Sequence, residues 1–184
     1  MSYALLATYT LTGPLPPLED TCRRLVGESQ HFVDQSGATT RGWYDVSGFS
    51  AGADLLVWWT DDDPERLQDA AHRLRASALG RYLAPEWSVI SRGDLPTTPA
   101  GDWLAVLPDT PAPKRVTDVT VTELTGRGLG APQVTSLVEG PVLDDVIVAA
   151  SKPAQSGLAR AVVGAGYTGV RVSPAEWAER QPRA

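Results

Sequence analysis

The order of strand-like and helix-like patterns in the first ninety or so residues most constrains the fold of this chain. Apolar side chains alternate over 3–12, which is typical of a strand with one buried face. The helical spacing of apolar residues then predicts two helices. One follows the first strand and is predicted to end at Ser36–Gly37, and the other begins at Pro64 and is predicted to end at Gly80. Further strands are expected at 39–47, 53–60 and 86–91.

The resulting order is strand, helix, strand, strand, helix, strand. It predicts a ferredoxin-like βαββαβ unit of the α+β class. Such a unit packs both helices on one face of an antiparallel sheet. The other face is apolar, so a second unit of this kind or a second subunit has to cover it.

The apolar side chains of the two helices are assigned to the core. Because Cys22 lies within the stripe of the first helix, it is interpreted as a small core residue rather than a reactive thiol. Leu74 on the second helix and Trp58 on the preceding strand are predicted to be buried. The stripe of the first helix consists of Leu18, Cys22, Leu25 and Phe32.

Three consecutive aspartates, Asp61 to Asp63, precede the second helix. Asp63 is interpreted as the N-cap and Pro64 as the first helical residue, since acidic side chains favour a helix N-terminus. We therefore predict no metal ion at this position. His72 lies away from the apolar face of the same helix and is predicted to be solvated.

The pattern weakens in the second half of the chain. Residues 95–115 contain five prolines and are interpreted as a connection, interrupted by a short strand at 103–107. The predicted division is a ferredoxin-like unit (1–94), this Pro-rich connection (95–115) and a divergent second sheet unit (116–184). Within the last unit, strands are expected at 116–124 and 167–172, and helices at 155–163 and from Pro174.

Composition excludes several classes of partner. A net charge of -6 argues against binding to nucleic acid, which requires a basic face. No apolar run is long enough to span a membrane, and the N-terminus lacks the cationic start and cleavage site of a signal peptide. We therefore expect no membrane partner and a cytoplasmic protein. The single cysteine allows no disulfide within the chain.

Glycine-rich motifs do not indicate a nucleotide site. GAGYTG at 164–169 has the three spaced glycines of a dinucleotide fingerprint, but that motif needs a strand before it and a helix after it. Here the expected order is reversed, so the glycines are interpreted as a helix cap and a turn. GRGLG at 126–130 is similarly interpreted as a loop. With no serine in a nucleophile elbow and no metal-ligand spacing, the catalytic residues stay unknown.

Three stretches of the first half occur in a long and ordered spacing: RGWYDVSGFSAGADLLVWW (41–59), PERLQDAAHRLRASALGRYL (64–83) and PEWSVIS (85–91). They resemble the chlorite dismutase superfamily, and most of all its actinobacterial coproheme decarboxylases, also called HemQ. The resemblance covers the N-terminal half, whereas the C-terminal half is divergent.

The resemblance implies a fold and a place for a cofactor. It implies a ferredoxin-like βαββαβ unit followed by a second, eroded sheet unit, together forming an α+β barrel of the chlorite dismutase type, and it implies oligomers. It also implies that haem belongs to the second unit, where a histidine holds the iron. Trp43, Trp58 and Trp59 are therefore interpreted as core and interface residues rather than as a haem cradle.

The chain departs from this family where haem would be held. No histidine occurs from Pro85 to Ala184. Leu107 stands where coproheme decarboxylases have a tyrosine, so radical decarboxylation by that route is excluded. Pro111–Pro113 occupies the place where the first helix of the second unit would begin.

These departures favour a divergent family member that lacks the histidine-ligated haem site and acts as a binding or assembly module, with no cofactor or with weakly bound haem. One alternative is a peroxidase-like haem oxidoreductase with an unusual iron ligand, for which Tyr167, Lys114, Lys152 and His31 are the candidates. The other alternative is a metal-free enzyme that uses the barrel cavity.

The remaining site and partner predictions follow from the same hypothesis. Lys114 and Arg115 are the candidates for contacts with haem propionates or another anion. No metal site is expected, and His31 is the one histidine considered as a ligand. We expect a homo-oligomer, with a hetero-oligomer containing a full-length relative as the alternative.

Overall fold

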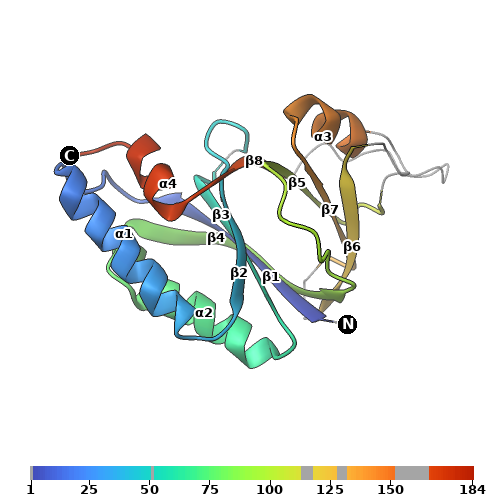
Figure 1. The fold of residues 1–184 in the computed structure, drawn as a ribbon, viewed down its shortest axis with the longest axis horizontal. Helices are drawn as coiled ribbons and strands as arrows, with labels where there is room; N and C mark the ends of the chain where they lie inside the picture. Colours follow the sequence, from blue (N-terminus) through green and yellow to red (C-terminus); the bar gives the residue numbers. More distant parts are fainter. Residues whose placement is uncertain (1, 51, 113–117, 128–131, 152–165) are drawn as a thin grey trace.

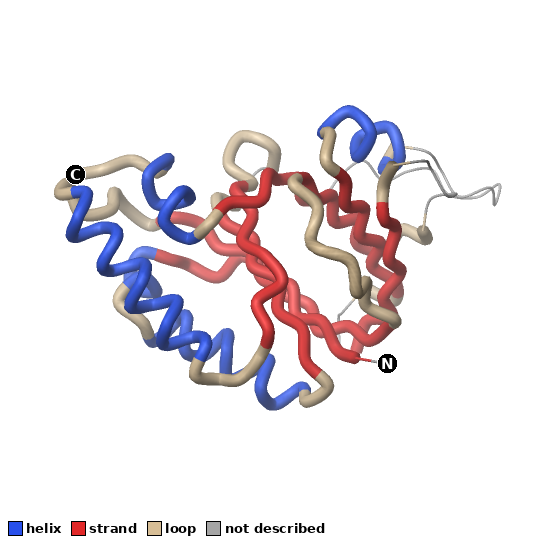
Figure 2. Tube along the Cα trace, in the orientation of Figure 1, coloured by secondary structure: helices blue, strands red, loops and turns tan. Residues whose placement is uncertain are grey.

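The computed structural model describes residues 2–50, 52–112, 118–127, 132–151 and 166–184, which are coloured in Figure 1. Eight antiparallel strands close into a barrel, and the helices lie outside it (Figures 1 and 2). The strands are β1 (Ser2–Leu11), β2 (Thr39–Asp45), β3 (Leu55–Asp61), β4 (Leu83–Gly93), β5 (Trp103–Pro108), β6 (Thr120–Arg127), β7 (Val134–Gly140) and β8 (Tyr167–Val172). The helices are α1 (Glu19–Asp34), α2 (Pro64–Ala76), the 3-10 turn η1 (Leu79–Tyr82), α3 (Leu143–Ala150) and α4 (Pro174–Arg180).

The barrel consists of two sheets with the same strand order. Around the barrel the order is β1-β3-β2-β8-β5-β7-β6-β4, so the first unit reads β4-β1-β3-β2 and the second reads β8-β5-β7-β6. Both are the order of a ferredoxin-like sheet. The units join where β2 pairs with β8 and where β4 pairs with β6. The predicted α+β barrel of two units is confirmed, and each sheet covers the apolar inner face of the other.

The two crossovers of the second unit differ in length and in their described structure. Only eleven residues, 109–119, connect β5 to β6, and the described ones form turns and irregular backbone. The second crossover keeps the helix α3. Residues 113–117 of the first crossover lie outside the described residues, so the expected loss of the first helix stays a prediction. The division at 94 and 115 stays a prediction, although β5, which lies inside the predicted connection, pairs with both β7 and β8.

Three groups of buried side chains form the core. One fills the inside of the barrel and includes Trp58, one lies between the first sheet and its helices and includes Leu74, and a smaller one lies between the second sheet and α3. Trp58 and Leu74 are both 0% exposed, as predicted. Cys22 is also buried, in the group beneath α1.

The apolar stripe predicted for the first helix is partly wrong. Leu18 is 68% exposed because it lies at the N-cap position, before the first helical turn. Phe32 is 37% exposed and contacts the guanidinium of Arg73, whose central carbon lies 5.0 Å from the ring centroid. The face of α1 that packs on the sheet instead consists of Cys22, Val26, Ser29 and Val33.

The start of α2 follows the prediction. The Asp63 side chain accepts a hydrogen bond of 2.9 Å from the backbone N–H of Glu65, and Pro64 begins the helix. The helix ends earlier than expected, at Ala76, and the Ser77 hydroxyl donates to the carbonyl of Leu74 at 2.7 Å. Gly80 lies in the 3-10 turn that follows rather than at the helix end.

The second half was predicted less well. β6 begins at Thr120 rather than at 116, and β7 was not predicted as a strand. The helix expected at 155–163 lies outside the described residues, as does the start of GAGYTG. Gly169 of that motif lies on β8, where a Cβ atom would meet the carbonyl oxygen of Asp45 at 2.6 Å. The lack of a side chain at Gly169 therefore allows β8 to lie close to the end of β2.

No helix in the described ranges is long and apolar enough to cross a membrane. The cytoplasmic location stays a prediction.

Candidate functional site

The resemblance implied a haem in the second unit, whose sheet has one face towards the barrel interior and one outer face. This outer face is small and apolar, and α3 covers it by packing Val146 and Ala149 against Ala105 and Val138. Leu107 is half-buried at the margin of the same group. The leucine that replaces the family's tyrosine therefore faces the covered, outer side of the sheet and provides no polar atom there.

The described residues of this unit do not supply an iron ligand. The only tyrosine of the second half, Tyr167, points into the barrel, where its ring lies 5.3 Å from that of Trp87. The sequence after Pro85 has no histidine, and within the described ranges no three acidic, histidine or cysteine side chains are grouped to hold a metal ion. The donor set present does not fit a ligated haem iron. Lys114, Arg115 and Lys152 lie outside the described residues.

The two histidines both belong to the helices of the first unit. His31 lies in the last turn of α1 and is exposed to solvent. His72 is also exposed, as predicted, but it lines the groove described below.

The tryptophan-rich stretch is part of the core. Trp58 and Trp59 are 0% exposed and Trp43 is 2% exposed. Trp58 points into the barrel, whereas Trp43 and Trp59 pack under the helices, where the Trp43 ring lies 6.5 Å from that of Trp177 on α4. This stretch forms no surface that a flat ligand could contact.

Arg41, the first residue of that stretch, forms a buried ion pair between the two units. The register of β2 shifts between Thr40 and Gly42, so Arg41 is the extra residue of a β-bulge, a feature that redirects a side chain. Its guanidinium contacts the Glu139 carboxylate of β7 at 2.7 Å, and the two side chains are 11% and 2% exposed. It also lies over the Trp58 ring, 4.8 Å from the centroid.

Further hydrogen bonds tie this ion pair to the Pro-rich connection. Arg41 donates to the carbonyl oxygens of Pro96 and Thr98 at 3.2 and 3.1 Å. Glu139 accepts from the Tyr44 hydroxyl at 3.4 Å and from the Gly101 N–H at 3.3 Å. Burial, and next the nearby negative charge of Glu139, raises the pKa of Tyr44, so Tyr44 stays a donor. This network holds three segments together, although the buried Nε of Arg41 makes no hydrogen bond within the described residues.

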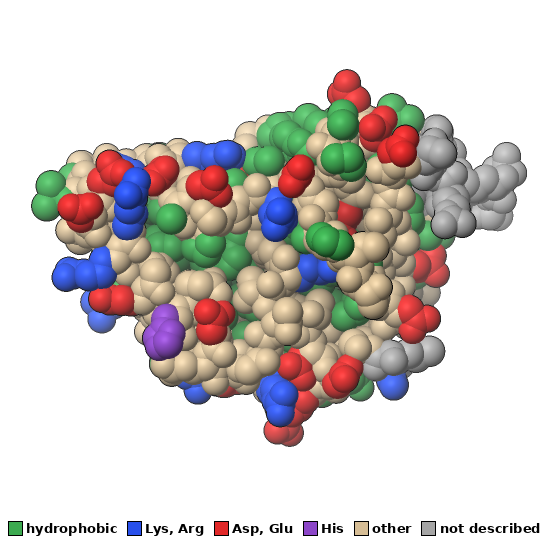
Figure 3. All heavy atoms as spheres, viewed as in Figure 1, with side chains coloured by type: hydrophobic (Ala, Val, Ile, Leu, Met, Phe, Trp, Pro, Cys, Tyr) green, Lys and Arg blue, Asp and Glu red, His purple; other side chains and the backbone are tan. Residues whose placement is uncertain are grey.

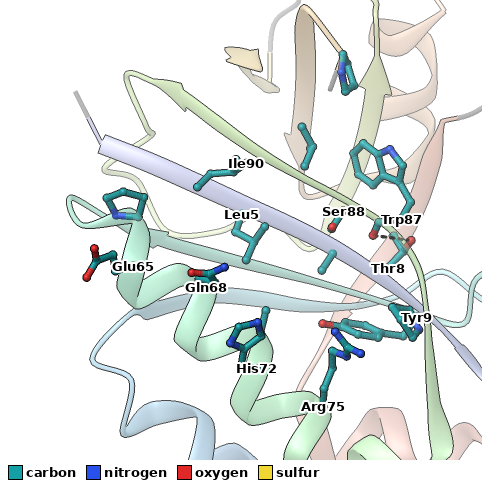
Figure 4. A pocket seen from close by; sticks show the side chains of 16 residues that line it. Leu5, Thr8, Tyr9, Glu65, Gln68, His72, Arg75, Trp87, Ser88 and Ile90 are labelled. Atoms are coloured by element: carbon teal, nitrogen blue, oxygen red, sulfur yellow. Dashed lines mark hydrogen bonds between the residues drawn. The ribbon is translucent and has the colours of Figure 1, made fainter. Parts of the chain in front are cut away.

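An open groove lies between α2 and β4, and we call it the α2–β4 groove (Figure 4). Its volume is about 720 Å³, within the range of small-molecule sites. β1 and β4 form its floor, and α2 forms one wall. Pro132, just before β7, also lines the groove, and the described part of β6 pairs with β4 only at residues 90–92. Before residue 90, no described residue of β6 pairs with β4.

Four polar residues of α2 line the groove: Glu65, Gln68, His72 and Arg75. Their spacing of three, four and three places them on one helix face, while Leu67, Ala70 and Leu74 bury the opposite one. The floor below them is apolar and includes Leu5, Ala7 and Ile90. The groove thus combines an apolar floor with one polar wall.

Tyr9 adds a hydroxyl to the floor beside this wall. Figure 4 shows its hydroxyl end directed towards His72 and Arg75. Burial raises the pKa of Tyr9 to about 12, and the positive charge of Arg75 opposes that shift only in part. Tyr9 therefore carries its proton at neutral pH and is a hydrogen-bond donor.

Sequence reasoning missed both the groove and the buried ion pair. It identified His72 as exposed but grouped Tyr9 with the core strand, because alternation does not reveal which core residues lie under a cavity. The spacing of polar residues along α2 was the available signal. The Arg41–Glu139 pair joins residues 98 positions apart, so no local pattern could show it.

Comparison with known proteins finds a family match in the first half of the chain. The sequence model of the chlorite dismutase family matches residues 22–96. A curated coproheme decarboxylase from Mycolicibacterium smegmatis is 37% identical over 71 residues, which is 36% of this chain and 31% of that protein. Because less than a third of that relative is matched, its activity is not transferred on this basis.

The fold likeness extends over nearly the whole chain. A mutant chlorite dismutase from Candidatus Nitrospira defluvii in complex with cyanide superposes with a TM-score of 0.78, over 97% of this chain and 94% of that one, at 15% identity. The structure of the same organism's chlorite dismutase in complex with imidazole gives 0.76 over the same shares, also at 15% identity. At this identity the likeness concerns the fold alone.

Proposed function

We propose that the chain is a divergent member of the chlorite dismutase superfamily that works without histidine-ligated haem, as a binding or assembly module. The main support for this proposal is the lack of an iron donor on the described part of the second sheet. Among the described residues its outer face offers no iron donor, with Tyr167 turned into the barrel and α3 packed on Ala105 and Val138. An α2–β4 groove of about 720 Å³ supports a binding role.

Decarboxylation of coproheme, the activity in the name of the curated relative, does not belong to this proposal. Leu107 has no phenol group, and the family sequence match ends at residue 96, before the second unit begins. A peroxidase-like function would need another ligand, but His31 lies on α1, which packs on the other unit. Use of the barrel interior by a metal-free enzyme is disfavoured by the large side chains that fill it, among them Trp58 and Leu137.

A haem titration tests the proposal. Hemin added to the purified protein is expected to give neither stoichiometric binding nor the Soret band of a histidine ligand, because the directional bond to iron is missing. The measurements are absorbance spectra and the iron content of the purified protein. The positive control is the apoprotein of a haem protein whose iron is held by histidine.

The same titration also covers weak haem binding. If haem binds weakly, a double variant with Lys114→Ala and Arg115→Ala is expected to weaken it, since the propionates would lose counter-charges. Tight, stoichiometric haem with a histidine-ligated spectrum would contradict the proposal.

Assembly into a homo-oligomer is part of the proposal. The barrel closes within one chain, so the reason for assembly has to lie on the outside. Hydrophobic side chains gather over and beside α3 in Figure 3, and Val142, Ile147 and Val148 are 43–50% exposed. Apolar patches of this kind are typical of interfaces. Sedimentation at micromolar concentration is expected to show a dimer or larger species, whereas a clean monomer would remove homo-oligomerisation and leave a full-length relative as the partner.

A further inference from the structure

The uncovered floor of the α2–β4 groove follows from where the helices pack. α2 contacts β3 and β1, so the outer face of β4 extends beyond the helix layer. Leu5 is 9% exposed and Ile90 is half-buried, and both line the groove. An apolar floor of this kind favours the apolar part of a ligand, because its burial removes surface from water.

The polar wall carries its positive charge at one end. Glu65 and Arg75 are ten residues apart, which separates them by about 15 Å along the helix axis. The groove therefore suits an elongated ligand rather than a compact one. Glu65 and Gln68 line the end near the start of α2, and His72 and Arg75 line the other end.

Arg75 differs from the other arginines of α2. Arg66 lies within 4 Å of Asp61 and Asp63, and Arg73 contacts Asp69 at 2.7 Å. Arg75 makes no ion pair within the part of the chain that the structure describes, and it lies at the groove beside Tyr9. A guanidinium next to a neutral hydroxyl and an imidazole is a donor set that matches a carboxylate.

We propose that the α2–β4 groove binds an elongated apolar carboxylic acid. Its carboxylate pairs with Arg75 and accepts hydrogen bonds from Tyr9 and His72. Its apolar body covers Leu5 and Ile90. This inference rests on the proposed function, because it names the ligand class that the binding module takes.

Two matched fluorescent probes test this inference: dansyl-aminoundecanoic acid, and its methyl ester, which lacks the negative charge. The acid is expected to bind the full-length protein about tenfold or more tightly than the ester, since a charge-assisted pair is lost in the ester. Arg75→Ala should weaken the acid by a similar factor and leave the ester unchanged. His72→Ala and Tyr9→Phe should each weaken the acid by a smaller factor. The measurement is dansyl fluorescence at fixed salt.

Arg73→Ala is the matched control, because it removes the same charge from the same helix turn but from a side chain that contacts Asp69 and Gln35. It is expected to bind both probes like the wild type. Equal binding of acid and ester, or equal weakening by Arg73→Ala and Arg75→Ala, would overturn the inference.

A second variant tests the location of the probe. Ser88→Trp fills the groove from the exposed face of β4 and should abolish binding of both probes while circular dichroism stays unchanged. Unchanged binding would place the probe elsewhere and overturn the inference. If the wild type binds neither probe and Ser88→Trp dissociates an oligomer, the groove is a subunit interface and the inference is also overturned.

The probe and haem experiments test different claims, and either claim can be contradicted while the other stands. Tight histidine-ligated haem, with the probe results as expected, would remove the proposed haem-independent function and leave the carboxylate site in place. Absent haem binding, with equal acid and ester binding, would leave the proposed function in place and remove the carboxylate site.

Discussion

Replacing Arg41 with alanine is expected to lower the free energy of unfolding by about 3–5 kcal/mol, the cost typical of breaking a buried ion pair on one side. The substitution leaves the Glu139 carboxylate, 2% exposed, without its counter-charge. It also removes two hydrogen bonds to the connection, at Pro96 and Thr98. Urea denaturation of the wild type and the variant measures the difference.

Two further variants show whether the cost comes from the buried charge. Arg66→Ala breaks an ion pair in which the arginine is 57% exposed, and it should change stability by less than about 1 kcal/mol. Adding Glu139→Leu to Arg41→Ala should recover part of the loss, because the uncompensated charge is then gone. If Arg41→Ala costs no more than Arg66→Ala, the network does not hold the units together.

This network gives the RGWYDV stretch a structural explanation. Its residues alternate between the two cores, with Trp43 under the helices and Tyr44 inside the barrel. Gly42 is required because a Cβ atom there would lie 2.7 Å from the Tyr44 ring. Arg41 then reaches the other unit through the bulge. The stretch that carries the family resemblance is therefore built for barrel closure.

The first unit could be predicted because its strands and helices repeat with a clear period. β1 and the buried face of α2 were assigned from alternation and helical spacing. β7 has no such signal, because six of its seven residues are buried and both of its faces pack against a core. A strand buried on both sides loses the contrast on which the prediction depends.

For the second unit, the sequence could predict only that the histidine ligand of a haem iron is missing. The absence of histidine after Pro85 is visible in the sequence, and the structure adds that Tyr167 faces inwards. The α2–β4 groove depends on how far α2 extends over the sheet, which is decided by packing against α1 and β3 rather than by local pattern. The periodicity of a sequence does not predict how far a helix extends over a sheet.

Leu74→Ala is expected to lower the free energy of unfolding by about 2–5 kcal/mol, through lost burial and the cavity left behind. Leu74 is 0% exposed and lies between α2 and the first sheet, in the group that also contains Leu67 and Trp59. Close-packed neighbours relax only in part, so most of the lost contact is not recovered. Urea denaturation at neutral pH measures the difference.

Leu18→Ala is the matched control for this prediction. It removes the same atoms from a side chain that is 68% exposed, so the expected change is within about 0.5 kcal/mol. Both leucines were assigned to helical stripes by the same periodicity, and only the structure separates the buried one from the N-cap residue. A loss of a few tenths of a kcal/mol for Leu74→Ala as well would mean that the face of α2 on the sheet is misassigned. The opposite face, with His72 and Arg75, would then not line the α2–β4 groove.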